Sequence, residues 1–547
     1  MKTQSKLILL VIMVTALSGC MQQFIRDTGP EHQALLNVDV NQIDAVTLEA
    51  LSKTEPISID QAAEQYKAVL LENENNKESV SLSLADIRAS ALSNNLQLKV
   101  DLVNPSMAQQ QYLAERAKFE AAFFGGIQYS DSTSPTSSQL DTAKSSNTAF
   151  EIGLRQPLPI GGNITIRQPN GRYDNDNQFS ILNPSFASDL RFTISQPLLR
   201  GAGMKTNTHS IRVARLQEKM SEAQTKLQAI RVLADADCAY WRVYGASQEL
   251  FVSQQQYQLA ERQLVEARLR VESGAAPKVE IVRAESGVAA RREGIIIALT
   301  NLRLYERNLK RIMNRDDMPL DSITGILPQT DPTPLKIQLD PKELVAFAII
   351  NRMEIYGLEL QTAIDQSLID ASRNARLPGL SVESTVNING LGNSFGKSYD
   401  DIRSGEFTDW SLGLQGEIPL GNKAANARLR YAKLALAQRL ATKEQRSQLI
   451  EQEVLNAIDL LEQNWQRILA SRQDVLFAAR TYHAERKQFE QGVRTSTDVL
   501  LAAGRLATAQ LREVRALIDY QIAQVDIALS TGTLLGQAGI QWQPMDL

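Results

Sequence analysis

The stretch Gly274-Ala275-Ala276-Pro277-Lys278-Val279-Glu280-Ile281-Val282-Arg283-Ala284 has a counterpart 218 residues later. That counterpart reads Gly492-Val493-Arg494-Thr495-Ser496-Thr497-Asp498-Val499-Leu500-Leu501-Ala502. Further upstream, Ala91–Leu98 matches Ala348–Ile355 at an offset of 257 residues. Two long copies of one pattern in a single chain predict a pseudo-symmetric subunit built from two structural repeats.

Each copy has the same order of elements: a helix, a strand region, a very long helix, a short break and a second long helix. The first repeat is expected over 83–318, with strands within 125–200 and long helices over 205–273 and 278–314. The second is expected over 342–537, with strands within 379–420 and long helices over 423–491 and 497–535. Residues 319–341, rich in proline, are expected to link the repeats, and 538–547 to form a C-terminal tail.

The strand regions show alternation with a period of two. Phe150, Ile152 and Leu154 alternate with polar or small residues, and Trp410, Leu412 and Leu414 do the same in the second copy. Such a pattern is typical of strands with one apolar and one polar face. The second strand block is shorter by 35 residues, so the first copy is expected to carry the larger loop or an added hairpin, which leaves four or six strands for the protomer.

The long helices lack internal proline and are rich in alanine, glutamine, glutamate, arginine and leucine, all good helix formers. Small residues recur at one position of a heptad, which lets neighbouring helices approach closely as in a coiled coil. At 1.5 Å per residue, a run of this length makes a rod of roughly 100 Å. In the shorter helix before the first strand block, Pro105 is expected to cause a kink or an end.

The amino terminus resembles a bacterial lipoprotein signal. Lys2 and Lys6 flank an apolar run that ends in Leu-Ser-Gly before Cys20, so residues 1–19 are expected to be removed and Cys20 to be lipidated. An ordinary secretion signal that contains a cysteine is the alternative. By resemblance to enterobacterial lipoprotein sorting rules, Met21 after the cysteine implies sorting to the outer membrane. Residues 20–82 are expected to form an N-terminal extension, and no long apolar segment follows residue 19.

Several classes of protein receive no support. The formal net charge of −4 over 547 residues gives no argument for nucleic-acid binding. Cys238 is the one other cysteine, and three scattered histidines make no metal cluster, so no metal or other cofactor is predicted. No nucleophile, base and orienting group occur at recognisable spacing, so an enzyme with catalytic residues is not predicted.

Strands and rods together indicate a membrane pore. Strands of about ten residues match the length a tilted strand needs to cross a bilayer. So few strands cannot close a barrel within one chain, and open edges in lipid leave backbone groups without partners. Closure therefore requires several copies, and the helices are expected to continue the cylinder in water as a hollow tube.

The doubled layout carries a family resemblance. The junctions Gln196–Gly203 and Glu417–Asn422 and the tip Gly492–Ala502 resemble the TolC family of outer-membrane efflux proteins, over roughly residues 83–535. The resemblance implies a mainly α-helical fold with a transmembrane β-barrel portion: a homotrimeric barrel continued by a long periplasmic α-helical coiled-coil barrel. It also implies docking onto a periplasmic adaptor and an inner-membrane RND or ABC transporter, as an exit duct for efflux or type I secretion.

The same resemblance implies site residues at the helix tips. Asp498 falls on the family's aperture aspartate, Arg494 on its gating arginine and Phe489 on a tip aromatic, with Glu280 at the matching acidic position of the first copy. An Arg494–Glu280 link is expected to close the gate, and Leu501 stands where a second aspartate is common. The alternative is that Asp498 and Glu280 are solvated charges at helix starts.

The turns that contain Gly274, Pro277, Gly492 and Thr495 are expected to contact the adaptor. Because glycine is also what any helix reversal needs, the turn residues have a purely structural reading as well. The competing function for the whole chain is a lipid-anchored coiled-coil scaffold or adhesin that conducts nothing. The strand blocks favour the duct, since a scaffold has no use for them.

Overall fold

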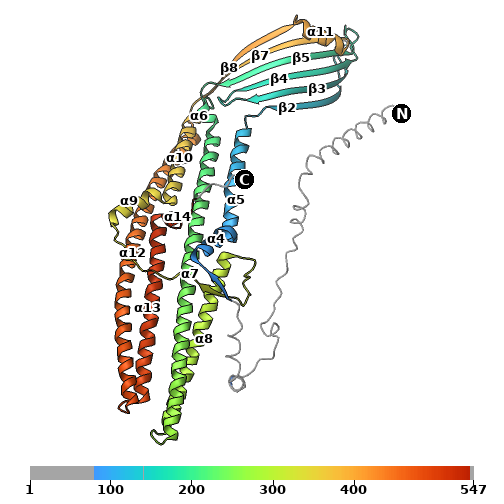
Figure 1. The fold of residues 1–547 in the computed structure, drawn as a ribbon. Coiled ribbons are helices and arrows are strands. Elements are labelled where there is room, and N and C mark those ends of the chain that lie inside the picture. Colours follow the sequence, from blue (N-terminus) through green and yellow to red (C-terminus); the bar gives the residue numbers. More distant parts are fainter. Residues whose placement is uncertain (1–58, 60–78, 139–140, 542–547) are drawn as a thin grey trace, which may run out of the picture. The chain divides into compact units, whose positions relative to one another are not determined.

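The protein is described from a computed structural model that covers residues 79–138 and 141–541, together with Ile59 (Figure 1). The expected signal segment 1–19, the lipidation candidate Cys20 and nearly all of the extension before residue 79 lie outside the described residues. All the elements named below lie after Lys77.

The elements of the first repeat are α4 (Leu84–Asn94), α5 (Leu96–Ala117), β2 (Ala122–Thr133), β3 (Lys144–Pro157), β4 (Asn163–Asn175), β5 (Ser185–Pro197), α6 (Met204–Asn207), α7 (His209–Glu272) and α8 (Val279–Met313). Those of the second are α9 (Pro341–Asn351), α10 (Met353–Asn374), β7 (Gly379–Gly392), α11 (Phe395–Ser404), β8 (Thr408–Glu417), α12 (Lys423–Glu490) and α13 (Ser496–Thr531). A last short helix, α14 (Leu534–Gln537), follows. The same order of helix, strands and two long helices thus occurs twice.

The break in the first helix differs from the one expected. It falls at Asn95 and not at Pro105, through which α5 continues. Asn95 caps α5, since its side chain accepts a hydrogen bond from the amide of Leu98 at 3.1 Å. It also donates to the carbonyl of Ile312 at the end of α8, 3.0 Å away. Two satisfied polar contacts at a buried asparagine fix the break there.

The segment between the repeats is more than a linker. Within it, β6 (Gly325–Pro328) pairs in parallel with β1 (Ser79–Leu82), which precedes the first repeat. This small two-stranded sheet packs on the largest buried cluster, in which the side chains of Ile87, Tyr240 and Leu309 are fully buried. The chain that enters the first repeat and the chain that leaves it are therefore tied together beside α7.

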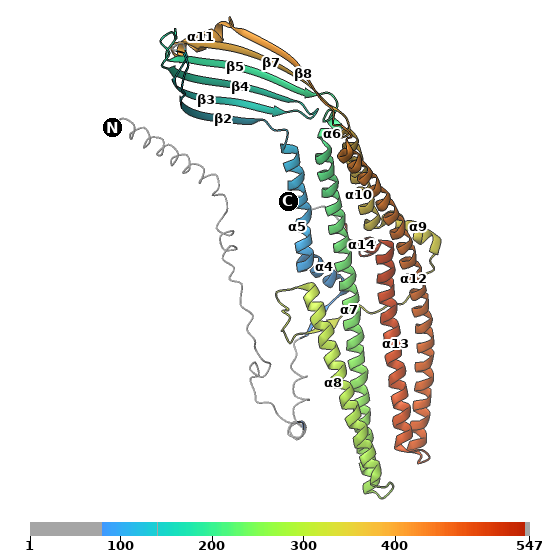
Figure 2. The same cartoon turned by 180° about the vertical axis from the view of Figure 1, so that it is seen from behind.

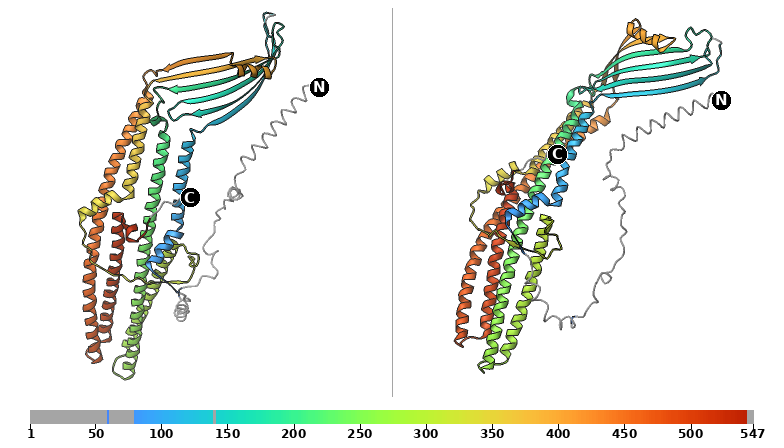
Figure 3. Two further views of the ribbon diagram at one scale, coloured as in Figure 1. Left: turned by 45° about the horizontal axis from the view of Figure 1, so that its top comes forward. Right: turned by 45° about the vertical axis from the view of Figure 1, so that its right-hand side comes forward.

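The long helices form two antiparallel pairs, α7 with α8 and α12 with α13, which lie side by side (Figures 1 and 2). On the half nearer the large sheet, α5 packs on α7, and α10 packs on both α7 and α12. The sheet lies at one end of the helices, and the turns between the paired helices lie at the other (Figure 3). Among the described residues, no helix combines the length and the apolar character needed to cross a membrane.

The large sheet has six strands in the order β2-β3-β4-β5-β7-β8, and all neighbours are antiparallel. The added hairpin that the first copy's extra length permitted is therefore present, and the protomer has six strands in this sheet. β2 and β8 are the edges, and nearly every residue along them is exposed.

A buried ion pair joins α4 to α7. Arg88 donates from Nε and an η nitrogen to the two carboxylate oxygens of Asp237, both at 2.7 Å, and the Asp237 side chain is fully buried. Burial raises the pKa of Asp237, and the hydrogen bonds and charge of Arg88 offset part of that rise. The pair holds the short helix at the start of the repeat against the long one.

Replacing Arg88 tests this contact. Arg88→Ala leaves a buried carboxylate without its partner, which is expected to cost about 3–5 kcal/mol in unfolding free energy at pH 7. The pKa of Asp237 then rises further, so the loss applies above the carboxyl's unfolded-state pKa and shrinks as the pH falls through the folded-state value. Thermal unfolding followed by circular dichroism at pH 7 and pH 5 measures both effects. Arg486→Ala, which removes an exposed pair with Glu490, is the control and should change little; equal losses for the two variants would contradict the account.

Candidate functional site

The two helix tips are built by the same backbone motif. At the end of α7, the amide of Gly274 bonds the carbonyl of Val271 and that of Ala275 the carbonyl of Arg270, at 3.1 and 2.8 Å. At the end of α12, Gly492 and Val493 make the equivalent bonds at 2.9 and 3.0 Å. Both glycines have a positive φ, 75° and 78°, which this way of ending a helix requires. The tip glycines are therefore explained by helix reversal, and adaptor contact remains a further role to be tested.

Asp498 and Thr495 form a capping box at the start of α13. The Thr495 amide and hydroxyl both donate to one carboxylate oxygen of Asp498, at 3.0 and 2.8 Å. These hydrogen bonds, the backbone one first, lower the pKa of Asp498, and Arg494 lowers it further. The carboxylate therefore stays ionised and keeps a structural task at the helix start, in addition to any role at an aperture.

In the first copy the equivalent acid, Glu280, does not cap its own helix. Pro277 stands at the position of Thr495, so α8 has no capping box, and Glu280 is not engaged by its own helix start. Instead Glu280 accepts a hydrogen bond from the hydroxyl of Ser496 on α13. Arg283, one turn along α8, pairs with the same carboxylate at 2.8 Å. Glu280 thus links one helix pair to the other.

The expected Arg494–Glu280 link is not formed within the chain. Nε of Arg494 donates to the side-chain oxygen of Gln488 at 3.1 Å. It also lies 3.2 Å from a carboxylate oxygen of Glu485, close enough for an ion pair although not aligned as a hydrogen bond. Both partners belong to α12, so Arg494 makes its contacts within its own helix pair. Ser496, and not Arg494, is the residue that contacts Glu280.

Phe489 makes a second link between the helix pairs. Its ring is almost fully buried, in a cluster with Tyr482 and Val499. The guanidinium of Arg270, at the end of α7, lies 3.8 Å from the ring centroid and also donates to the Phe489 carbonyl at 3.0 Å. The sequence marked Phe489 but gave no sign of the contacts of Arg270 and Ser496, because an arginine at a helix end and a serine at a helix start are ordinary residues there.

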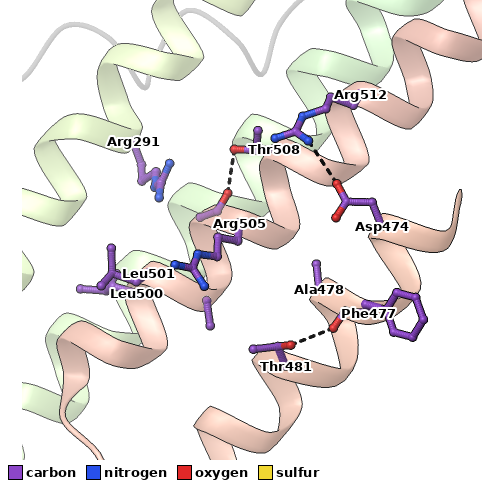
Figure 4. Close-up of a pocket in the computed structure, with 12 residues that line it drawn as sticks. Arg291, Asp474, Phe477, Ala478, Thr481, Leu500, Leu501, Arg505, Thr508 and Arg512 are labelled. Carbon is purple, nitrogen blue, oxygen red and sulfur yellow. Dashed lines mark hydrogen bonds and ion pairs between the residues drawn. The ribbon is translucent and has the colours of Figure 1, made fainter. Parts of the chain in front are cut away.

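A groove of about 700 Å³ lies between the helix pairs above the tips, between α8, α12 and α13 (Figure 4). Exposed Phe477 and Leu501 are among the side chains that line it. Arg291 and Arg505 face it without an acidic side chain within ion-pair distance among the described residues, while Arg512 is paired with Asp474 at 3.2 Å. Its lining therefore combines apolar side chains with three arginines and one aspartate.

The sheet at the opposite end has two unlike faces. On β8, Trp410, Leu412 and Leu414 share one face and are each more than two-thirds exposed. Ser411 and Gly413 lie on the other face. The same alternation continues on β7, where Val386 lies opposite Trp410 and Thr385 opposite Ser411. A sheet with a bare apolar face and a polar reverse is typical of a wall between lipid and water.

Comparison with known proteins agrees with this geometry. Residues 345–533 match the family model described as outer membrane efflux protein. That match covers most of the second repeat. No curated protein matches the sequence.

Solved structures show that the fold extends over both repeats. A membrane protein from Pseudomonas aeruginosa is 20% identical, with a TM-score of 0.63 over 82% of this chain and 93% of that one. The Campylobacter jejuni CmeC outer membrane channel is 15% identical, with a TM-score of 0.62 over 82% and 85%. The open state of the Neisseria gonorrhoeae MtrE outer membrane channel is 17% identical, with a TM-score of 0.60 over 82% and 89%. The predicted TolC-like fold is confirmed.

Proposed function

We propose that the chain is the outer-membrane exit duct of a tripartite efflux or type I secretion system. Three copies form the duct, lipid anchors at Cys20 attach them to the membrane, and the helices extend into the periplasm. Cargo passes without energy input from this subunit, which is not an enzyme. The periplasmic tip opens when a periplasmic adaptor and an inner-membrane RND or ABC transporter dock. The alternative, a lipid-anchored scaffold or adhesin, has the same helices but no pore.

One observation carries the proposal: the sheet has an apolar face with large exposed side chains, a polar face and two edges that no other described strand pairs with, and it stands at the end of helices of 64 and 68 residues. In lipid the unpaired backbone groups of the edges need partners, which further copies supply. A membrane position accounts for the exposed Trp410, Leu412 and Leu414, which a water-soluble scaffold would have to cover.

The tips and the groove above them support a docking role. Phe477, Leu501, Arg291 and Arg505 offer apolar contact flanked by positive charge, which suits a helical partner that carries leucine and acidic side chains. The turns at Gly274–Pro277 and Gly492–Thr495 lie beyond this groove. Two links, Ser496 to Glu280 and Arg270 to Phe489, hold the helix pairs together at the tip, and their rupture is the local step of opening.

Arginine substitutions on β8 test which face meets lipid. Leu412→Arg places a charge in hydrocarbon, at an expected cost of about 2–4 kcal/mol near the bilayer midplane. Ser411→Arg, the adjacent residue on the opposite face, is the matched control and is expected to assemble normally. The yield of folded oligomer in isolated outer membranes measures the difference. Equal yields for the two variants would contradict a lipid-facing apolar side.

Planar-bilayer recording separates the duct from the scaffold. The full-length purified protein is expected to give discrete conductance steps when added to a bilayer. The steps should be small because the tip links hold the periplasmic end narrow. Ser496→Ala combined with Arg270→Ala removes both links, so conductance is expected to rise at least about twofold. A folded, membrane-bound protein that gives no steps, with or without these substitutions, would favour the scaffold.

The charge of Asp498 is separable from its capping role. Asp498→Asn keeps an oxygen that accepts from Thr495 but removes the charge, so a ring of three such carboxylates loses its attraction for cations. In a KCl gradient, the reversal potential is expected to shift towards the value of a pore that does not prefer cations over anions. Thr495→Ala weakens the cap and keeps the charge, so its cation preference should match the wild type. Unchanged selectivity in Asp498→Asn would leave Asp498 as a cap alone.

A further inference from the structure

The first repeat contains a strand hairpin that the second lacks. β2 follows α5 as β7 follows α10, and β5 leads towards α7 as β8 leads towards α12. The hairpin β3–β4, residues 144–175, stands between β2 and β5 and has no counterpart in the second repeat. Its length accounts for most of the 35-residue difference between the two strand blocks.

This hairpin is part of the wall of the sheet. A row of large apolar side chains crosses all six strands in direct register, and both hairpin strands contribute to it. Its members are Phe123, Leu154, Ile166, Phe192, Val386 and Trp410. Because side chains alternate between faces, a hairpin packed as a separate flap would not continue this row.

The opposite face is continuous as well. Its neighbouring row is polar from β3 to β8, with members Ala122, Arg155, Thr165, Thr193, Thr385 and Ser411. Charges of both signs lie on this face, among them Glu151 and Arg167, which form an ion pair at 3.6 Å across β3 and β4. The inserted strands therefore extend the water-facing surface together with the lipid-facing one.

The helix α11 leaves the polar face free. Its Phe395 ring lies between Phe150 and Phe186, with centroids 5.6 and 4.8 Å away, and Tyr399 donates to Asn170 at 2.8 Å. These three partners all belong to the face of the apolar row, at the end of the strands far from the long helices. The helix thus covers the outer rim of the sheet and does not fill the space on its polar side.

The edges are arranged for closure by further copies. β2 runs away from the helices and β8 runs back towards them, so β8 of one copy meets β2 of the next antiparallel, as all pairs within the sheet do. We propose that three copies close a barrel of 18 strands, six from each, and that the inserted hairpin adapts the duct to bulky, hydrated cargo. This rests on the proposed function.

The physical consequence is a wider outlet. Barrel diameter grows roughly linearly with strand number, so six strands from each copy make a barrel about 1.5 times as wide as four would. Barrels of 16–18 strands enclose an aqueous channel. Since the polar face carries hydroxyls and charges of both signs, the outlet selects by size and not by the sign of the charge.

Thiol labelling on β4 tests whether the hairpin lies in the wall. Thr165→Cys belongs to the polar row and Ile166→Cys, its neighbour, to the apolar row. A membrane-impermeant maleimide applied to intact outer membranes is expected to label Thr165→Cys at least about tenfold faster. Wild type is the blank, because burial raises the pKa of the Cys238 thiol to about 12 and keeps it protonated. Similar rates at both positions would overturn the wall assignment.

Deletion of residues 144–175 tests the width. It joins the loop after β2 directly to the loop before β5, both at the same end of the sheet, and leaves a first repeat with two strands like the second. Polyethylene glycols of graded size, added to the extracellular side of a bilayer, report the largest polymer that enters the outlet. The wild-type cut-off is expected to exceed that of the deletion variant, and strand counting in electron cryomicroscopy maps of the wild type should give 18.

The outcomes separate this inference from the proposed function. A wild-type protein that neither trimerises nor conducts overturns both. A conducting trimer whose barrel has 12 strands, or whose polymer cut-off is unchanged by the deletion, overturns the wide outlet alone. If the deletion variant does not fold, two measurements on the undeleted chain still test the wide outlet. These are the strand count of the wild type and the labelling of Thr165→Cys and Ile166→Cys.

Discussion

The structure depends on the fact that its main sheet is unfinished. Among the described residues, β2 and β8 each have a strand partner on one side only, and the face they share presents Phe123 and Trp410, each about three-quarters exposed. Apolar side chains of this size favour lipid, whereas unpaired backbone groups cannot remain in lipid. Further strands paired with both edges would satisfy both conditions, and in the proposed trimer the neighbouring copies supply them. The order of the sheet, its antiparallel direction at both edges and its two unlike faces all suit such an addition.

The four long helices pack in register although few of the side chains between them are bulky. Alanines fill the seams between helices, and polar contacts fix the ends: Arg88 with Asp237 near the start of the repeat, Ser496 with Glu280 at the tip. The two repeats have diverged at the tip. The acid of the second copy caps its own helix, and the acid of the first, freed by Pro277, reaches across to the other pair. Pseudo-symmetry of the backbone therefore does not extend to the side chains that link the helix pairs at the tip.

Much of the fold was predictable because it is periodic. The repeat at Gly274 and Gly492, the strand alternation and the proline-free helices led to the TolC-like architecture, which the comparisons confirm. For residues 144–175 the sequence did not decide between a loop and an added hairpin, because alternation of side chains does not show which segments pair. The break at Asn95 was not predicted, because the carbonyl of Ile312 that fixes it lies 217 residues away in the sequence.

The tip shows where sequence reasoning fails. A residue that matches a family motif does not reveal which side chain it contacts. Arg494 contacts Glu485 and Gln488, which belong to its own helix pair. The substitution of Pro277 for the capping threonine was visible in the aligned copies and would have signalled that Glu280 has no cap to serve. Ser496 and Arg270 carried no comparable sign, since a serine at a helix start and an arginine at a helix end are ordinary residues there.

Native mass spectrometry of the full-length protein, released from detergent, tests the central claim most directly. Completion of the sheet by other copies predicts a single dominant species of three chains, with the strand content retained. A stable one-chain species that keeps the β2 and β8 edges folded in detergent would contradict it.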